Sequence, residues 1–321
     1  MINDEPITPS ISGAPEEVQQ NIVEDVKKAA EEEQLAVCKI KIGISISENE
    51  DLEKLGFAKI HLKDLMVEIA RNLLINDFSI IYGGDLRKEG FTEIFSDLAY
   101  QYRTIKEAKS MCFENYFSFP IYLQLTKAHI LEFKKHGANI IKVSPTEDLG
   151  IDSNNYIRPD TLQAKYIWAR SLSKMRGEMI SESKGRILIG GRLNHYLGML
   201  PGVIEEAQIT LEQDKPLYLV GGYGGCASQV ANALLGKHFT FIEDMFHQGE
   251  DYQMFKAYYN ERQPERLIDL QALSHFFEGY GLERLAANNG LSKEENLRLF
   301  TTPHLSEIIY LIFKGLNTIN G

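Results

Sequence analysis

The sequence lacks several features that would place it quickly in a known class of protein. Cysteine is scarce: the 321 residues contain three, Cys38, Cys112 and Cys226, and no two of them form a CxxC pair. This spacing predicts neither a zinc site nor a disulfide framework. The odd number is typical of a protein kept in a reducing compartment, so we expect a cytoplasmic protein without a metal site.

Long hydrophobic runs and excess positive charge are also missing. The nearest candidate for a membrane segment, IIYLIFKG at 308–315, is far shorter than the roughly 18 residues that a spanning helix needs. The net charge is −11 at pH 7, which disfavours bulk attraction to nucleic acid or to an anionic membrane. The acidic, polar N-terminus does not resemble a signal peptide. We therefore expect neither nucleic acid nor a membrane as a partner.

Two common nucleotide-binding signatures are absent as well. The chain contains no G-x-G-x-x-G fingerprint and no G-x-x-x-x-G-K-[ST] loop. Both an ordinary Rossmann dehydrogenase and a P-loop NTPase are therefore disfavoured. The chain also has no internal repeat and no low-complexity tract, which leaves the hydrophobic pattern as the main guide to its fold.

That pattern divides the chain into three parts. Residues 1–34 are polar and acidic, and we expect a disordered arm followed by an acidic helix over 15–34. From residue 35 to residue 239, short apolar segments alternate with amphipathic ones. This alternation predicts an α/β fold, a Rossmann-like doubly wound parallel sheet that binds a ligand. Residues 240–321 are aromatic-rich and helical in pattern, and we expect a C-terminal helical region packed on that domain.

Several segments are predicted strands: 35–47, 78–84 and 138–145, with two more inside 185–192 and 215–225. Of these, 35–47 has a period of two, whereas 78–84 is short and continuously apolar, as strands buried on both faces are. A sixth candidate is 116–125, where Pro120 cannot donate a ladder hydrogen bond. Proline therefore places that strand at an edge of the sheet.

Three of these strands end in a pair of glycines, in IIYGGD (80–85), ILIGGR (187–192) and YLVGGYGG (218–225). Ligands of an open parallel sheet bind at the carboxyl ends of its strands, where glycine lets the backbone approach a phosphate. The alternative is that a tight strand-to-helix turn needs glycine in any case. The segment SISENEDL (45–52) follows the first strand and is a fourth candidate. The residues that we expect to bind ligand at these turns are Ser45, Ser47, Gly83, Gly84, Asp85, Arg87, Thr92, Gly190, Gly191, Arg192, Gly221, Gly222, Gly224 and Gly225.

Three longer blocks carry a resemblance to a known family: IIYGGDL at 80–86, KMRGEM at 174–179, and ILIGGRLNHYLGMLPGVIEEA at 187–207. Their order resembles the SLOG superfamily, which includes the Lonely Guy phosphoribohydrolases, formerly called lysine decarboxylases. Those enzymes carry a strand ending in YGGG, a helix with an arginine, and a PGGxGTxxE loop. The nearest resemblance is to a prokaryotic SLOG group related to the cytoplasmic sensing domain of melastatin-type channels. It spans roughly residues 37–235.

The resemblance implies a nucleotide pocket and assigns roles to a few residues. Arg176 falls where the hydrolases have a catalytic arginine, Glu206 at the final glutamate of their loop, and Gly202 at its glycine. Glu205 lies beside them and joins the expected ligand-binding residues. The loop also departs from the family pattern, because Val203 replaces the threonine and RLNHYLGML separates the glycine pair from Pro201.

The individual residues have structural as well as functional interpretations. Asp85 would accept hydrogen bonds from ribose, or would cap its own turn. Arg87 and Arg192 would clamp phosphates, or would form surface ion pairs. Glu206 would act on a glycosidic bond, or it and Glu205 would only favour the helix dipole. His195 is interpreted as a solvated loop histidine.

Three functions follow, and we favour the first. It is a sensor module that binds an NAD-derived or ADP-ribose-like nucleotide, with no other cofactor required, as a homo-oligomer that passes the signal to an effector protein. SLOG proteins often occur in bacterial conflict and nucleotide-signalling systems, which suggests that setting by analogy. The alternative is a hydrolase that cleaves a nucleotide N-glycosidic bond with Arg176 and Glu206. The third is a scaffold whose helices at 15–34 and 240–321 bind other proteins.

Overall fold

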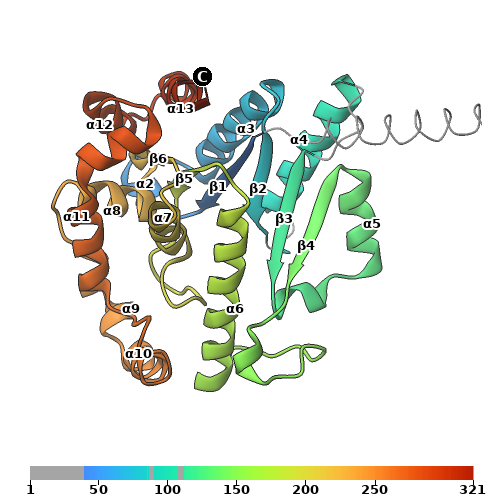
Figure 1. Ribbon diagram of the computed structural model, residues 1–321, viewed down its shortest axis with the longest axis vertical. Coiled ribbons are helices and arrows are strands. Elements are labelled where there is room, and N and C mark those ends of the chain that lie inside the picture. Colours follow the sequence, from blue (N-terminus) through green and yellow to red (C-terminus); the bar gives the residue numbers. More distant parts are fainter. Residues whose placement is uncertain (1–39, 85, 87–89, 107–111, 321) are drawn as a thin grey trace, which may run out of the picture. The chain divides into compact units, whose positions relative to one another are not determined.

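Six parallel strands form a single sheet in the order β4-β3-β2-β1-β5-β6 in this computed structural model (Figure 1). The structure describes residues 40–84, 86, 90–106 and 112–320. The chain divides after Lys39 into two units, and the unit from Ile40 onward contains all the described residues. The strands are β1 (Lys41–Ser47), β2 (Ser79–Gly83), β3 (Phe113–Ser118), β4 (Ala138–Val143), β5 (Gly185–Gly190) and β6 (Leu217–Val220).

The strand order shows where a doubly wound sheet reverses. Strands β1 to β4 are added in one direction, and the chain then returns to place β5 on the other side of β1. β1 therefore pairs with β2 on one side and with β5 on the other, from Ile42 opposite Gly185 to Ser47 opposite Gly190. The Rossmann-like α/β prediction is confirmed. The reversal makes the carboxyl ends of β1 and β5 the expected ligand position.

One face of the sheet is covered by helices from both ends of the described chain. α3 (Lys59–Ile75) buries the apolar stripe that its 3.6-residue period predicts, and α4 (Phe91–Lys106) packs beside it. α13 (Leu305–Asn320) completes this face: Ile308, Leu311 and Ile312 share a core with Tyr218 and Val220 of β6. The C-terminal helix therefore covers the part of the sheet that α3 and α4 do not cover (Figure 1).

The opposite face is covered by α6 (Leu162–Ser181), α7 (Gly202–Glu212) and α8 (Gly225–Leu234). An outer layer of C-terminal helices lies against them, with α10 (Glu250–Arg262) on α6 and α11 (Leu270–Asn289) on α8. One hydrophobic cluster holds residues of both layers, such as Val230 and Phe277. The remaining elements are α2 (Asp51–Lys54), η1 (Ile121–Gln124), α5 (Lys127–Lys135), η2 (Glu147–Leu149), η3 (Gly221–Tyr223), η4 (Thr240–Glu243), α9 (Met245–Gln248) and α12 (Lys293–Thr301).

Some sequence predictions need correction or lie outside these residues. The edge strand over 116–125 is wrong: β3 ends at Ser118, lies between β2 and β4, and is followed by η1. The strand stops before Pro120, so the proline does not interrupt its ladder and an inner position is allowed. The predicted acidic helix over 15–34, together with Asp85 and Arg87, lies outside the described residues.

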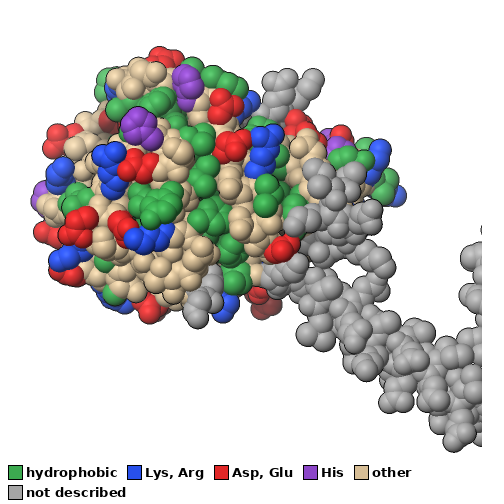
Figure 2. Space-filling model, turned by 90° about the horizontal axis from the view of Figure 1, so that it is seen from above, with side chains coloured by type: hydrophobic (Ala, Val, Ile, Leu, Met, Phe, Trp, Pro, Cys, Tyr) green, Lys and Arg blue, Asp and Glu red, His purple; other side chains and the backbone are tan. Residues whose placement is uncertain are grey.

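The surface near α3, α12 and α13 mixes both signs of charge. Figure 2 shows this side from above: acidic and basic side chains are interspersed, with hydrophobic side chains between them. Exposed apolar side chains on these helices include Ile75 and Tyr310. Of the helices that the structure describes, none combines the length and the apolar run that crossing a bilayer requires.

Candidate functional site

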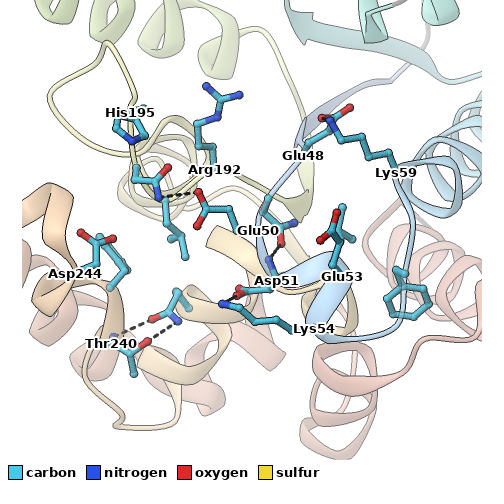
Figure 3. Close-up of a pocket in the computed structure, with 17 residues that line it drawn as sticks. Glu48, Glu50, Asp51, Glu53, Lys54, Lys59, Arg192, His195, Thr240 and Asp244 are labelled. Carbon is cyan, nitrogen blue, oxygen red and sulfur yellow. Dashed lines mark hydrogen bonds and ion pairs between the residues drawn. The ribbon is translucent and has the colours of Figure 1, made fainter.

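A cavity of about 570 Å³ lies where the sheet reverses. It is lined by the segment after β1, between Glu48 and Lys59, and by the segment after β5, from Arg192 to His195. Thr240, Phe241 and Asp244, which precede α9, close a third side (Figure 3). Both strand ends at the switch point thus open into a single cavity, as expected for a ligand site of an open α/β sheet.

Carboxylates outnumber cations in the lining of this cavity. Some are neutralised nearby: the Lys59 ammonium lies 2.6 Å from Glu48, and the Lys54 ammonium 3.4 Å from Asp51. Glu50 only accepts a hydrogen bond, 3.0 Å long, from the Asn194 side chain. The acidic lining residues are Glu48, Glu50, Asp51, Glu53 and Asp244, and the basic ones are Lys54, Lys59 and Arg192.

Arg192 is the predicted phosphate ligand that reaches the cavity. Its backbone N–H donates to the hydroxyl of Ser47 over 2.9 Å, which ties the end of β1 to the segment after β5. Its guanidinium points away from Glu50 in Figure 3 and makes no ion pair within the described residues. His195, which we interpreted as a solvated loop residue, is exposed, lines the same cavity and contacts the Phe246 ring at 4.9 Å.

The turn after β6 lies close to the cavity loops, but the N–H group at the start of its helix already donates a hydrogen bond within the protein. Gly225 begins α8, and its N–H donates to a carboxylate oxygen of Asp51 over 3.0 Å. The Cys226 N–H donates to the carbonyl of Gly191 over 3.0 Å. Gly191 has φ +105°, and a Cβ there would lie 2.6 Å from that of Cys226, so only glycine fits. The helix end predicted to hold a phosphate thus holds an internal carboxylate.

The other predicted glycines do not themselves line the cavity, although two of them border residues that do. Gly221 and Gly222 leave room for a close backbone approach by Phe300 and Thr302, at the end of α12. Gly83 contacts Met175, and the Gly84 N–H donates to the Tyr116 carbonyl over 2.8 Å. The remaining ones are Gly190, whose backbone ends β5; Gly224, which lies against Asp51; and Gly202, which begins α7.

Thr92 belongs to a separate hollow. It lies in the first turn of α4, is buried, and lines a cavity of about 220 Å³ together with Ser96 and residues of α5 such as His129. The structure therefore does not bring Thr92 together with Arg192. Ser45 is also elsewhere, because it lies inside β1 and points to the α7 face, where its hydroxyl donates to Glu206.

The residues matched to the hydrolases form a buried ionic network on that face. The Arg176 guanidinium pairs with Glu205, and its Nε lies 3.5 Å from Glu206. The hydroxyl of Ser173 also donates to Glu205. A side chain on Gly202 would come within 2.6 Å of the guanidinium, so glycine there lets α7 approach it. Arg176, Glu205 and Glu206 are therefore brought together, but not around the cavity.

Another charged residue of this network, Arg186, was not predicted from the sequence. Arg186 is fully buried in β5, and its guanidinium lies 2.9 Å from Glu206 and 3.0 Å from the Ser45 hydroxyl. Burial lowers the pKa of Arg186, and Glu206 opposes that shift. The available signal was a single charged residue inside the apolar segment 185–190, since an arginine buried in a parallel strand needs a carboxylate partner.

A second missed group connects the cavity wall to the C-terminal helices. His247 is 1% exposed; its Nδ1 lies 2.7 Å from Asp244 and its Nε2 3.1 Å from the hydroxyl of Tyr196. That hydroxyl lies 3.3 Å from the Tyr252 hydroxyl. Burial lowers the pKa of His247, while Asp244 opposes the shift. The neutral imidazole therefore connects Tyr196, in the expanded loop at 192–200 that separates the glycine pair from Pro201, to α9 and α10.

The described residues show no group of three His, Cys, Asp or Glu side chains placed to hold a metal ion. Burial raises the pKa of the Cys226 thiol, which makes it a poor nucleophile. The cavity presents the guanidinium of Arg192, which has no ion-pair partner among the described residues, together with several carboxylates and side chains of Phe57 and Phe241. This set can bind a polar organic ligand with hydroxyl groups and a negatively charged part.

Comparisons with known proteins agree with the motif order at the level of the family. No curated protein matches the chain. Among solved structures, it is similar to the X-ray structure of TM1055, a Northeast Structural Genomics Consortium target, at 15% identity and a TM-score of 0.35. That match covers 60% of this chain and 81% of the other, and a score this low adds nothing to the fold evidence. The relation to the melastatin-type sensing domain stays a prediction. The SLOG cluster2 family matches residues 36–299, and the chain belongs to that family.

Proposed function

We propose that this protein is a nucleotide-binding sensor module whose ligand is NAD-derived or ADP-ribose-like. The observation that supports this most directly is the position of the 570 Å³ cavity at the switch point between β1 and β5. A cavity of this size accommodates a small organic ligand of nucleotide dimensions. Family membership supports a nucleotide-related role.

The lining supplies partners for each part of such a ligand. Arg192 has a guanidinium without an ion-pair partner in the described part of the chain, and it would take a phosphate bidentately. Glu48 and Glu50 present carboxylate oxygens that accept hydrogen bonds from ribose hydroxyls. Phe57 and Phe241 offer apolar surface to a base.

The arrangement favours binding over cleavage. The hydrolase alternative relies on Arg176 and Glu206, which pair within a buried network and do not line the cavity. Both carboxylates of this network are engaged by arginines, and neither is presented to a ligand in the cavity. We therefore do not extend the hydrolase proposal.

Signal output is proposed through the C-terminal helices. Asp244 lines the cavity and also holds His247, which contacts Tyr196 of the expanded loop. A ligand that touches Asp244 would therefore act on both segments. Assembly as a homo-oligomer, an effector partner and a role in a bacterial defence or signalling system belong to the same proposal.

The test is native mass spectrometry of the full chain after incubation with NAD, ADP-ribose, AMP and cyclic nucleotides. We expect an intact adduct with a dinucleotide-type ligand, and its loss in Arg192→Ala. Arg158→Ala removes an exposed arginine outside the cavity lining and serves as the matched control. An adduct that survives in Arg192→Ala, or the absence of any adduct with folded protein, would contradict the proposal. Free base at low mass would support the hydrolase instead.

A further inference from the structure

The carboxylates that line the cavity differ in whether a cation lies beside them. Glu48 and Asp51 each have a lysine partner. Glu50 is bonded only to a neutral amide, and Glu53 makes no ion pair within the described residues. The partner of Asp244 is a buried histidine. Within the part of the chain that the structure describes, three lining carboxylates therefore lack a permanently charged cation, and they are Glu50, Glu53 and Asp244.

Against these carboxylates, the described lining residues include one cation that makes no ion pair with another described residue, Arg192. The usual second anion site of such a sheet is not available, because the N–H of Gly225 at the start of α8 already donates to Asp51. A ligand with a pyrophosphate would thus find one guanidinium for two negative charges. Its remaining charge would face carboxylates at the rim.

We propose that this cavity selects its dinucleotide by charge, preferring the oxidised pyridinium form over both the reduced form and ADP-ribose. This inference rests on the proposed function. The pyridinium ring carries one positive charge, whereas dihydronicotinamide and the free ribose of ADP-ribose carry none. The positive ring would lie among the carboxylates that have no cationic partner in the described structure and beside Phe57, which is partly exposed and stacks on Tyr223, as cationic ligands lie against aromatic rings in other proteins.

The oxidised and reduced dinucleotides make a sharp comparison because they have nearly the same size and differ by one charge. Isothermal titration calorimetry on the full chain would measure both, together with ADP-ribose, at low and at physiological salt. One charge near partly exposed carboxylates predicts about tenfold tighter binding of the oxidised form. Salt would reduce the ratio, because the Debye length at physiological ionic strength is about 8 Å.

The variant Glu50→Gln/Glu53→Gln keeps the side-chain shapes and removes two carboxylates from the rim. We expect its preference for the oxidised form to fall severalfold, while ADP-ribose binds more tightly than to the natural chain. Glu243→Gln is the matched control, since Glu243 is exposed next to Asp244 but does not line the cavity.

The outcomes separate this inference from the function on which it rests. Equal affinity for the three ligands, or tighter binding of the reduced form or ADP-ribose, would overturn the charge preference and leave the sensor proposal standing. A preference that the double variant retains unchanged would also overturn it. If folded protein binds none of the three, both proposals fail.

Discussion

Two groups of ionisable side chains lie against the same sheet and differ in almost every respect. Arg176, Arg186, Glu205 and Glu206 are buried on the α7 face and form ion pairs with one another. The cavity residues around Arg192 and Glu50 lie in open loops, and several have no charged partner among the described residues. The first group contains the residues that match the family's hydrolases. The difference shows that a motif residue can support the fold while unmatched loop residues form the cavity.

The largest expected effect is on the buried group. Arg186→Ala would leave Glu206 buried beside Arg176 alone, and removing one partner of a buried pair costs about 3–5 kcal/mol. Urea unfolding at pH 7 would measure the loss. The double variant Arg186→Met/Glu206→Leu should lose less than the single one. A loss under about 1 kcal/mol for Arg186→Ala would mean that the network does not hold the fold.

The next effect tests whether the glycines after β6 serve packing or ligand binding. In Gly221→Ala the new methyl group would collide with the Phe300 carbonyl, and overpacking of this kind costs about 1–3 kcal/mol. Thermal unfolding would report it. Gly279→Ala, in the helix α11 with open space around it, should instead stabilise by up to about 1 kcal/mol. Unchanged stability with lost nucleotide binding would restore the ligand role of Gly221.

A smaller effect should depend on pH. Because burial lowers the pKa of His247, the unfolded chain binds a proton there before the folded chain does as pH falls. Stability should therefore decrease below about pH 6.5, by at most about 1.4 kcal/mol per pH unit. Unfolding of the natural chain and of His247→Gln between pH 7.5 and 5.5 would isolate this contribution. Parallel curves would show that His247 does not titrate differently in the two states.

The smallest expected effect on stability is at the cavity itself. Arg192→Ala removes an exposed side chain without an ion-pair partner in the described structure, and we expect a change within about 0.5 kcal/mol. The same urea series as for Arg186→Ala would measure it. A loss as large as that of the buried arginine would mean that the two groups do not differ as described.

The fold could be predicted from sequence because its signals are local and repeated. Apolar strands such as 78–84 alternate with helices such as 162–183, and glycine pairs mark the strand ends. The order β4-β3-β2-β1-β5-β6 could not be predicted in this way, since strand pairing depends on contacts between distant residues. The position of β3 was misjudged because Pro120 lies just beyond the strand rather than within it.

The candidate site was less predictable for a related reason. Ser47 and Arg192 lie at strand ends and were predicted by name. Glu50 and Asp51 lie in the candidate segment 45–52 but were not predicted individually, because the four-residue helix that Asp51 begins is too short to show a pattern of its own. Asp244 and His247 follow Arg192 by more than 40 positions in the sequence, so only tertiary packing brings them to the cavity wall. Arg186 carried a usable signal, an isolated charge in an apolar strand, but only its partner Glu206 was singled out.

Helix α13 extends the part of the chain that must stay together if the domain is moved into another protein. The family match stops at residue 299, yet Leu311 and Leu316 belong to the same core as Ile187 and Tyr218. A gene fusion that carried residues 36–299 alone would remove these α13 side chains from the core that contains Ile187 of β5 and Tyr218 of β6. Exposed apolar parallel strands promote aggregation. Any recombination event that preserves this core must therefore keep the last helix together with the residues that the family model matches.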